Sequence, residues 1–373
     1  MKVGVKVTEK PVIVIGHGVR AAGVEAAKFL SCGMPVISSW QGADLVDNWH
    51  PMYFGRPGIY GQRTANRILY EADRIISIGC RLTPWMIGHS GLRPEQSLLM
   101  FDIDECETKR FPQAETVIGN LKETTERFNS AGRDHKDWLS LCNSWRTPWV
   151  ESPAHDDTNG YINSYRFIER LEPLLRSNEI IVTDVGSLMC PVFQALHVKP
   201  PQRLITSGGL GEMGCGLPAA IGASFASGNG EVLALIGDGG MMMNLQEMQT
   251  IVHHKLPIKI IVFENDGYAM IKGTHKNIKI PYTGVNKASG VSMPDFCHVA
   301  ESFGIEGLDA RSWNDIDRLL PYLFARSGPV MMVVHIDPEQ LYAPRLQPTI
   351  VDGKIMPPKF SEMSPRIVEA DCG

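Results

Sequence analysis

The chain has 373 residues, of which 43% are hydrophobic and 21% are charged, and its formal net charge is -5. This length favours two domains over one, and the composition is typical of a soluble globular protein. The small negative charge, without a long run of one sign, argues against nucleic acid as a partner, and no apolar stretch is long enough to cross a membrane.

The first half of the chain alternates between strand-like and helix-like segments. Strands are predicted at residues 11–16, 34–39, 73–79 and 97–104, and helices at residues 21–30, 64–72 and 137–145. Alternation at this spacing predicts βαβ units and a parallel sheet. We therefore expect an α/β domain over residues 1–146. A linker is expected over residues 147–162, where Pro, Asp, Asn and Gly gather without periodicity.

The second half repeats the alternation. Strands are predicted at residues 179–186, 203–207, 231–240, 258–267 and 329–337, and helices at residues 164–175, 213–226, 244–254, 293–304 and 313–325. These elements predict a second α/β domain over residues 163–340. A Pro-rich tail over residues 341–373 is expected to lie extended on another surface. The predicted fold class is thus α/β, with two doubly wound parallel-sheet domains.

An aspartate among glycines marks the end of one predicted strand. The amides of Gly239 and Gly240 could hold phosphate oxygens at this strand end, but the carboxylate of Asp238 would repel them. A divalent cation removes the conflict, because Mg²⁺ binds carboxylates together with phosphate oxygens. Asn265 and the Gly267 carbonyl, after the next strand, offer further oxygen ligands. The pattern indicates a metal–diphosphate site, although either stretch alone could be an ordinary turn.

The segment "GDGGMMMNLQEMQTIVHHKLPIKIIVFENDGY" carries a resemblance to a known family. It resembles the thiamine diphosphate signature, GDG followed by N(N/D)xG, of the acetohydroxyacid synthase and pyruvate decarboxylase superfamily. The segment "TSGGLGEMGCGLPAAIGA" is similar to the stretch that precedes this signature, and the first domain resembles the Rossmann-like middle domain through "KPVIVIGHG", "RIISIGCRL" and "FDIDE". The resemblance covers almost the whole chain.

The resemblance implies thiamine diphosphate and Mg²⁺ as cofactors, the metal being held by Asp238, Asn265 and the Gly267 carbonyl. Met213 matches a large apolar residue that forces the cofactor into its bent conformation, and the Gly211 carbonyl would accept a hydrogen bond from its amino group. The alternative for Met213 is plain core packing. The full implied cofactor set is Gly186, Ser187, Gly211, Met213, Gly237, Asp238, Gly239, Gly240, Asn265, Gly267, Tyr268 and Ala269.

The resemblance also implies decarboxylation of a small 2-keto acid, most simply pyruvate, and the protein decides the fate of the resulting carbanion. In pyruvate decarboxylases an acidic residue shortly after the second motif helps to protonate it, whereas Ile271 stands at that position here. This favours ligation to a second carbonyl, as in acetolactate synthesis, over simple decarboxylation. Lys272 could donate a proton, pair with a substrate carboxylate or be a solvated helix lysine. The residues expected to border the substrate are Tyr268, Met270, Ile271 and Lys272.

The family order is pyrimidine-binding, middle and diphosphate-binding domain, and this sequence begins at the middle domain, with a Met. The first of those domains carries the glutamate that activates the cofactor, and no residue here matches it. The sequence is therefore either a fragment or a subunit of a split enzyme, a heterodimer or (αβ)₂ whose partner supplies that domain. Two alternatives remain, a 2-keto acid decarboxylase subunit and a non-catalytic, thiamine diphosphate-binding regulatory protein.

The motif "GHGVRA" after the first strand is typical of a dinucleotide-binding fold. A nicotinamide site also expects an acidic residue at the end of the second strand, and "VISSW" offers none, which argues against a nicotinamide oxidoreductase. Some family members hold FAD or ADP in this domain. Arg81 matches a position that can contact FAD, or it is structural, so FAD is possible here but is not predicted.

The cysteines and the N-terminus bear on the cellular compartment. Eight cysteines form no CxxC pair, and the stretch "MKVGVKVTEKP" lacks the apolar core of a signal peptide. We therefore expect reduced thiols in a cytoplasmic protein.

Overall fold

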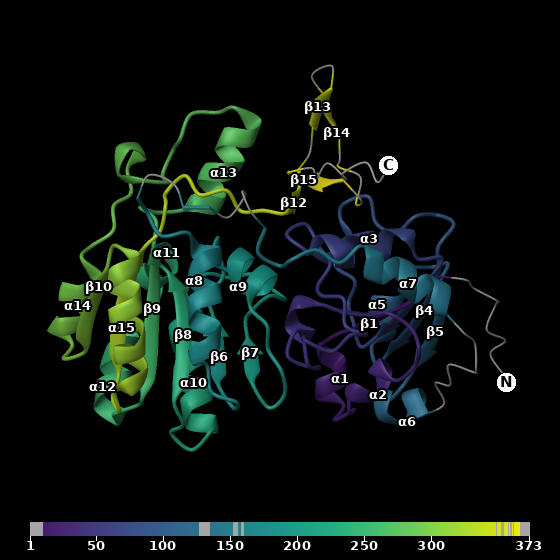
Figure 1. Cartoon of the computed structure of the whole chain (residues 1–373), viewed down its shortest axis with the longest axis horizontal. Helices are drawn as coiled ribbons and strands as arrows, with labels where there is room; N and C mark the ends of the chain where they lie inside the picture. Colours follow the sequence, from purple (N-terminus) through teal and green to yellow (C-terminus); the bar gives the residue numbers. More distant parts are fainter. Residues whose placement is uncertain are drawn as a thin grey trace. The chain divides into compact units, whose positions relative to one another are not determined.

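Two parallel β-sheets organise the chain in the computed structural model (Figure 1). The structure describes residues 10–126, 135–151, 156–157, 160–347, 349–351, 354–356, 358, 360 and 362–365. The chain divides into two units, one formed by the described residues of 1–149 and 343–373 and the other by those of 150–342. Both sheets have only parallel neighbours, so the predicted α/β class with two parallel-sheet domains is confirmed.

The sheet of the first unit has the order β2-β1-β3-β4-β5. Its strands are β1 (Pro11–Ile15), β2 (Val36–Ser38), β3 (Arg74–Ile78), β4 (Ser97–Asp102) and β5 (Glu115–Ile118). The helices around it are α1 (His17–Ala21), α2 (Ala27–Leu30), η1 (Trp40–Gly42), α3 (Arg63–Glu71), α4 (Pro84–Ile87), α5 (Glu105–Thr108), α6 (Leu121–Glu126) and α7 (Lys136–Ser144).

Both faces of this sheet are buried, which explains why its strands read as continuous apolar runs. Val12 and Val14 of β1 join one hydrophobic cluster, while Ile13 and Ile15 join another. Successive side chains of a strand point to opposite faces, so each apolar run supplies two cores at once. The core of the first unit is therefore a double layer on either side of its sheet.

The sheet of the second unit has the order β10-β11-β9-β8-β6-β7. Its strands are β6 (Ile180–Thr183), β7 (Arg203–Ile205), β8 (Val232–Gly237), β9 (Ile258–Glu264), β10 (Glu306–Ala310) and β11 (Val330–His335). Its helices are α8 (Ser164–Leu171), η2 (Glu172–Leu174), α9 (Met189–Ala195), α10 (Gly216–Ala226), α11 (Asp238–Asn244), η3 (Leu245–Glu247), α12 (Met248–His254), α13 (Ala269–Ile278), η4 (Lys287–Ser289), α14 (Phe296–Ser302) and α15 (Trp313–Ala325).

Helices cover both faces of this second sheet as well (Figure 1). On one face, Ile260 and Val262 of β9 pack in a cluster with residues of α10, α12 and α14. On the other face, Phe263 of β9 meets Phe167 of α8 edge to face, with ring centroids 5.2 Å apart. The carboxyl ends of β6, β8 and β9 therefore emerge side by side at one edge of a sheet that is fixed on both faces.

The segment after the second unit belongs to the first unit and contains short strands. It forms two antiparallel pairs, β12 (Arg345–Leu346) with β15 (Met363–Ser364) and β13 (Thr349–Val351) with β14 (Lys354–Met356). The amide of Leu346 donates to the carbonyl of Ile59 at 2.7 Å, and Arg63 donates to the carbonyl of Met363 at 3.2 Å. These bonds attach the segment to the loops of the first sheet.

Three sequence predictions differ from the structure. The helix predicted over residues 21–30 is wrong, because Gly23 adopts a left-handed φ of 65° that ends α1 before α2 begins. The strand predicted over residues 231–240 ends at Gly237, and Asp238 starts α11. The edge strands β5 and β10 were not predicted. β5 exposes most of its residues, β10 buries only two of its five, and neither has a continuous apolar run.

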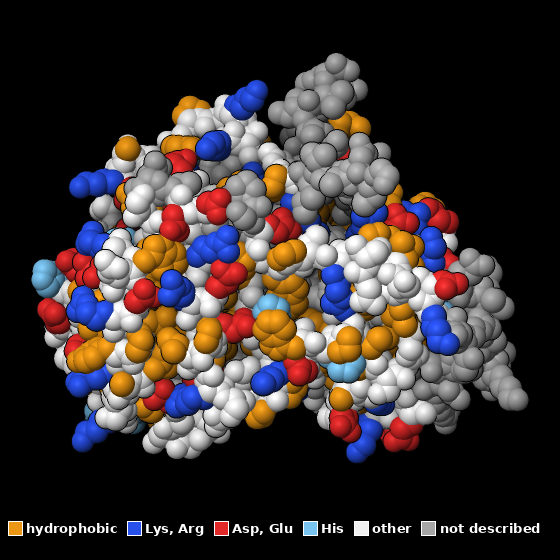
Figure 2. All heavy atoms as spheres, in the orientation of Figure 1, with side chains coloured by type: hydrophobic (Ala, Val, Ile, Leu, Met, Phe, Trp, Pro, Cys, Tyr) orange, Lys and Arg blue, Asp and Glu red, His pale blue; other side chains and the backbone are white. Residues whose placement is uncertain are grey.

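The helices and the surface of the described residues give two further observations. None of these helices combines the length and the apolar character that crossing a bilayer requires. On the face drawn in Figure 2, Lys and Arg side chains are interspersed with Asp and Glu side chains. This face therefore lacks the extended basic surface that is typical of nucleic-acid binding.

Candidate functional site

Three buried polar residues stand at neighbouring strand ends in the second unit. Asp184 follows β6, Asp238 follows β8 and Asn265 follows β9, and their exposed fractions are 0%, 2% and 6%. The three strands are consecutive in the sheet, so these residues meet at the edge where open α/β sheets bind ligands. We take this edge as the candidate site.

Asp238 organises the loop that follows β9. Its Oδ1 accepts a hydrogen bond from the amide of Gly239 at 2.8 Å. Its Oδ2 accepts from the amides of Asn265 at 3.0 Å and of Gly267 at 2.9 Å. Sequence spacing could only suggest that the two motifs meet, and the structure joins them through a single carboxylate.

Without a nearby positive charge, the ionised form of the Asp238 carboxyl is energetically unfavourable. Burial, with a smaller contribution from the negative charge of Glu264, raises its pKa to about 7 against the opposing effect of three amide hydrogen bonds. A cation at this position would favour the ionised carboxylate and relieve the desolvation cost.

Asn265 presents a side-chain oxygen that no described residue satisfies. Its Oδ1 is buried and accepts no hydrogen bond within the described part of the chain, while its Nδ2 donates to Oγ of Ser187 at 3.3 Å. A buried acceptor normally costs free energy unless something satisfies it. An unsatisfied amide oxygen next to a buried carboxylate suits Mg²⁺, which prefers hard oxygen ligands.

The chemistry of these donors fits a cation that also binds a ligand. Among the described residues, no group of three or more His, Cys, Asp or Glu side chains is arranged to hold a metal. One carboxylate, one amide oxygen and the Gly267 carbonyl form an incomplete set for an ion that takes about six oxygens. The remaining positions suit phosphate and water oxygens.

The glycines of the first motif make room for close neighbours. A Cβ on Gly239 would overlap the ring of Tyr268 and lie 3.3 Å from Cε of Met213, and a Cβ on Gly240 would overlap the carboxylate of Asp184. The structure thus brings Met213 and Tyr268 together over the start of α11. The amide of Gly239 is engaged by Asp238, so a phosphate would have to exchange this hydrogen bond.

Asp184 is a site residue that the sequence analysis missed. Its carboxylate accepts from the amides of Val185 at 2.8 Å and Gly214 at 3.0 Å, and burial raises its pKa. Asn244 of α11 donates to the Gly214 carbonyl at 2.7 Å, so the loop that carries Met213 is held from two sides. An acid directly after the run "IIVT" is the signal that could have identified it.

The other predicted cofactor residues lie in the turn before α9, in the loop before Met213 and at the end of β8. Gly186, with φ of 143°, and Ser187 form the turn before α9, and Ser187 reaches Asn265. Gly211, with φ of 78°, is exposed in the loop before Met213, and a Cβ built on it would meet no described atom within 4 Å. Gly237 ends β8.

The first turns of α13 carry Ala269 and the predicted substrate-bordering residues. Met270 is partly buried and Ile271 is 50% exposed. Lys272 is only 7% exposed, donates to the carbonyl of Pro338 at 3.1 Å and forms an ion pair with Glu339. Its interpretation as a solvated lysine is therefore wrong, and its pairing with a substrate carboxylate stays a prediction.

The glycines of "GHGVRA" serve packing inside the first unit. The amides of Gly16 and Gly18 donate to the carbonyls of Ile78 and Gly79, both at 3.0 Å, and a Cβ on Gly16 would overlap Gly79. These amides are thus already engaged by the end of β3. Arg81 is 63% exposed and pairs with Glu107 at 2.8 Å.

Comparisons with known proteins agree with this geometry. Residues 5–128 match the thiamine pyrophosphate enzyme central domain, and residues 184–334 match the thiamine pyrophosphate enzyme C-terminal TPP binding domain. A probable acetolactate synthase large subunit of Methanocaldococcus jannaschii is 30% identical over 95% of this chain and 64% of its own length. The isozyme 1 large subunit of acetolactate synthase from Escherichia coli K12 is 30% identical over 92% of this chain and 61% of its own length.

The isozyme 2 large subunit from the same organism is 28% identical over 93% of this chain and 64% of its own length. The chain thus spans less than two thirds of these relatives. The matched domains contain all the strand ends described above. The chain therefore belongs to the thiamine pyrophosphate enzymes, of which it carries the central and C-terminal domains, and it is homologous to acetolactate synthase large subunits.

Proposed function

We propose that this chain is a subunit of a split, acetolactate synthase-like enzyme that decarboxylates a 2-keto acid, pyruvate, and ligates the product to a second carbonyl. The proposal depends most on one observation. Oδ1 of Asn265 is buried and accepts no hydrogen bond from the described residues, and the backbone amide of Asn265 donates to the buried carboxylate of Asp238. Both residues lie within the matched thiamine pyrophosphate-binding domain. Asp238, Asn265 and the Gly267 carbonyl would hold Mg²⁺, and the first turn of α11 would meet the diphosphate.

Thiamine diphosphate, when bound, supplies the electron sink that the decarboxylation of a keto acid requires. The chain supplies the shape of the site. Met213 and Tyr268 crowd over Gly239, and Asp184 fixes the loop that carries Met213. These contacts support the proposed role of Met213 beneath a bent cofactor.

The preference for ligation over protonation rests on the first turn of α13. Ile271 cannot donate a proton, and its side chain is half exposed. Lys272, the neighbouring cation, is already paired with Glu339 and with the carbonyl of Pro338. Without a proton donor at position 271 and with Lys272 engaged, a second carbonyl would compete better for the reactive carbon.

A partner chain is the proposed source of the pyrimidine-binding domain and of the glutamate that activates the cofactor, in a heterodimer or (αβ)₂ assembly. The relatives are named large subunits, and the two matched domains are the central and C-terminal ones. The enzyme would act in the cytoplasm, in keeping with the free cysteines at positions 32, 80, 106, 142, 190, 215 and 297.

The test is an assay of pyruvate consumption with thiamine diphosphate and Mg²⁺, for this chain alone and mixed with a pyrimidine-domain protein. Turnover in the mixture only, with acetolactate as product, would support the proposal, and Asp238→Asn should abolish it. Acetaldehyde as product would replace the ligase by a decarboxylase. Cofactor binding without turnover over a panel of keto acids would indicate a non-catalytic role instead.

A further inference from the structure

Every amide of the loop Asn265–Tyr268, here called the cofactor loop, is held by a defined acceptor. Asp238 accepts hydrogen bonds from the amides of Asn265 and Gly267, and the Val285 carbonyl accepts one from the amide of Tyr268 at 2.9 Å. The remaining amide, that of Asp266, donates to Oε1 of Glu264 at 3.1 Å. The conformation of the loop therefore depends on a second carboxylate besides Asp238.

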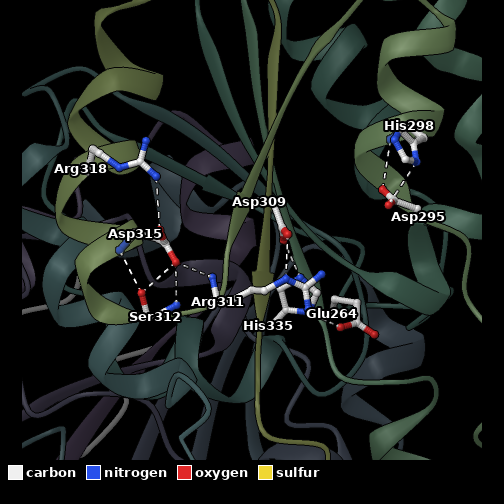
Figure 3. Close-up of polar contacts among 9 residues, drawn as sticks. All are labelled: Glu264, Asp295, His298, Asp309, Arg311, Ser312, Asp315, Arg318 and His335. Atoms are coloured by element: carbon white, nitrogen blue, oxygen red, sulfur yellow. Dashed lines mark hydrogen bonds and ion pairs between the residues drawn. The ribbon is translucent and has the colours of Figure 1, made fainter.

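Glu264 is itself held by a charged chain across three strand ends (Figure 3). Its Oε2 lies 2.7 Å from Nδ1 of His335, at the end of β11. Nε2 of the same ring lies 2.6 Å from Oδ1 of Asp309, on the edge strand β10. Arg311 closes the chain by donating to Oδ2 of Asp309 at 2.8 Å. These four residues are here called the histidine network.

The geometry favours the imidazolium form of His335. A neutral imidazole has one N–H, and here both ring nitrogens face carboxylate oxygens, which an imidazolium satisfies with two donors. Burial alone would lower the pKa of His335, but the hydrogen bonds and charges of Glu264 and Asp309 outweigh it and raise the pKa. The hydrogen bond from His335 in turn lowers the pKa of Glu264 and keeps it ionised.

The network ends at a strained point of the cofactor loop. Asp266 has a φ of 59°, a left-handed conformation that non-glycine residues rarely adopt. Such a conformation persists only when its surroundings hold it. The amide of this residue donates to Glu264, and the residue lies between Asn265 and Gly267, the two proposed metal-binding positions of the loop.

The network lies on the wall of a cavity of about 680 Å³, which Asp266, Lys287 and Asp295 also line. Glu264 and Asp309 each direct a carboxylate oxygen at the ring of His335 (Figure 3). Protein donors already engage the oxygens of both carboxylates. We therefore assign the two carboxylates to holding the loop beside the cavity rather than to binding a ligand in it.

We propose that His335 is a positioning residue that fixes the cofactor loop through Glu264, and so aims Oδ1 of Asn265 at the cation site beside Asp238. Neither His335 nor Glu264 belongs to the two signature motifs. The inference rests on the cation-binding part of the proposed function and is independent of which product the enzyme makes.

The test compares His335→Gln with a matched control in the full chain. His298 on α14 pairs with Asp295 at 3.2 Å and is 79% exposed (Figure 3). Among the described residues no hydrogen bond or ion pair joins it to the cofactor loop, so His298→Gln is the control. Hydrogen exchange is measured for the amides of Asn265–Tyr268 and, as reference, for α10. We expect His335→Gln to speed exchange of the loop about tenfold more than it speeds exchange of α10, whose amides report the loss of global stability.

A second readout is the affinity for Mn²⁺, used as a spectroscopic probe in the presence of thiamine diphosphate. It should fall about fivefold to twentyfold in His335→Gln and stay unchanged in His298→Gln. Glu264→Gln keeps an oxygen for the Asp266 amide but loses the ion pair, so it should give a smaller effect. His335→Arg retains a cation that can donate to both carboxylates and should restore part of the affinity.

Equal exchange of the loop in wild type and His335→Gln would overturn the inference. A uniform acceleration over the loop and α10 would also overturn it, because His335 would then stabilise the sheet without acting on the loop. Failure of the wild type to form acetolactate would contradict the proposed function but leave both readouts intact.

Discussion

The carboxylate of Asp184 packs directly against the backbone of Gly240, and a Cβ on this glycine would overlap Oδ2. The contact joins the end of β6 to the first turn of α11, and the same oxygen accepts the amide of Gly214. Three segments of the candidate site, which are distant in sequence, thus meet at one buried oxygen atom.

Replacement of Gly240 by Ala should therefore damage the site. We expect Gly240→Ala to lower the free energy of unfolding by about 1–3 kcal/mol, because either Asp184 or α11 must move. Urea denaturation measures the change. Gly222→Ala in α10 is the control, since a Cβ there meets nothing within 4 Å, and it should be neutral or stabilising by about 0.5–1 kcal/mol. Equal stability of both variants would contradict this packing argument.

Protons should compete with the cation at Asp238. Its ordinary pKa of 3.8 is raised to about 7, so the cation-free site is largely protonated below that pH. A metal ion needs the ionised carboxylate, and its affinity should rise about tenfold per pH unit up to about pH 7 and then level off. Titration with Mg²⁺ between about pH 5.5 and about pH 8 measures this. Affinity that does not change with pH would count against Asp238 as a ligand.

The histidine network should stabilise the protein within a defined pH window. The pKa of His335 is raised, so its contribution is complete below the ordinary value of 6.5 and is lost as the pH rises through the folded-state pKa. The pKa of Glu264 is lowered, so its contribution is present above 4.5 and is lost as the pH falls through its folded-state pKa.

The difference in unfolding free energy between wild type and His335→Gln should thus be largest between pH 4.5 and 6.5. We expect about 1–2 kcal/mol, since Asp309 is 43% exposed and solvent screens part of the interaction. Urea denaturation at several pH values measures the difference. A difference that grows steadily above pH 6.5 would show that the sign is wrong.

Restoring an acid on α13 should redirect the reaction. Ile271→Glu places a proton donor where Ile271 is 50% exposed, and we expect the ratio of acetaldehyde to acetolactate to rise about tenfold or more. Product analysis of the assembled enzyme provides the measurement. Ile278→Glu, on the same helix and 47% exposed at the native side chain, is the control and should leave the ratio unchanged. Similar product ratios in all three proteins would refute the assignment of Ile271.

The sequence predicted the central strands because each of them is buried on both faces. β8 and β9 are continuous apolar runs for this reason, and the signature motifs begin where these runs end. Of the edge strands, β2 and β7 were predicted, whereas β5 and β10 were not. β5 leaves Glu115 and Ile118 exposed, and no buried run marks it. Burial on both faces was thus the property that made a strand visible in the sequence.

The histidine network could not be predicted, because it depends on strand order. His335 is 71 residues from Glu264 and 26 residues from Asp309 in sequence. These residues become neighbours only because the order β10-β11-β9 places the last strand of the sheet between two earlier ones. Single-sequence patterns describe local periodicity and do not report such crossovers.

Asp238 holds the amides of Asn265 and Gly267 with the same oxygen. The carboxylate that would bind a cation has therefore already shaped the loop that presents the other oxygens. An arriving ion would meet a preorganised set of ligands and would lose little free energy in ordering them. Selectivity in such a site follows from the rigidity of the loop, because an ion of the wrong radius could not draw the oxygens inward without breaking these hydrogen bonds.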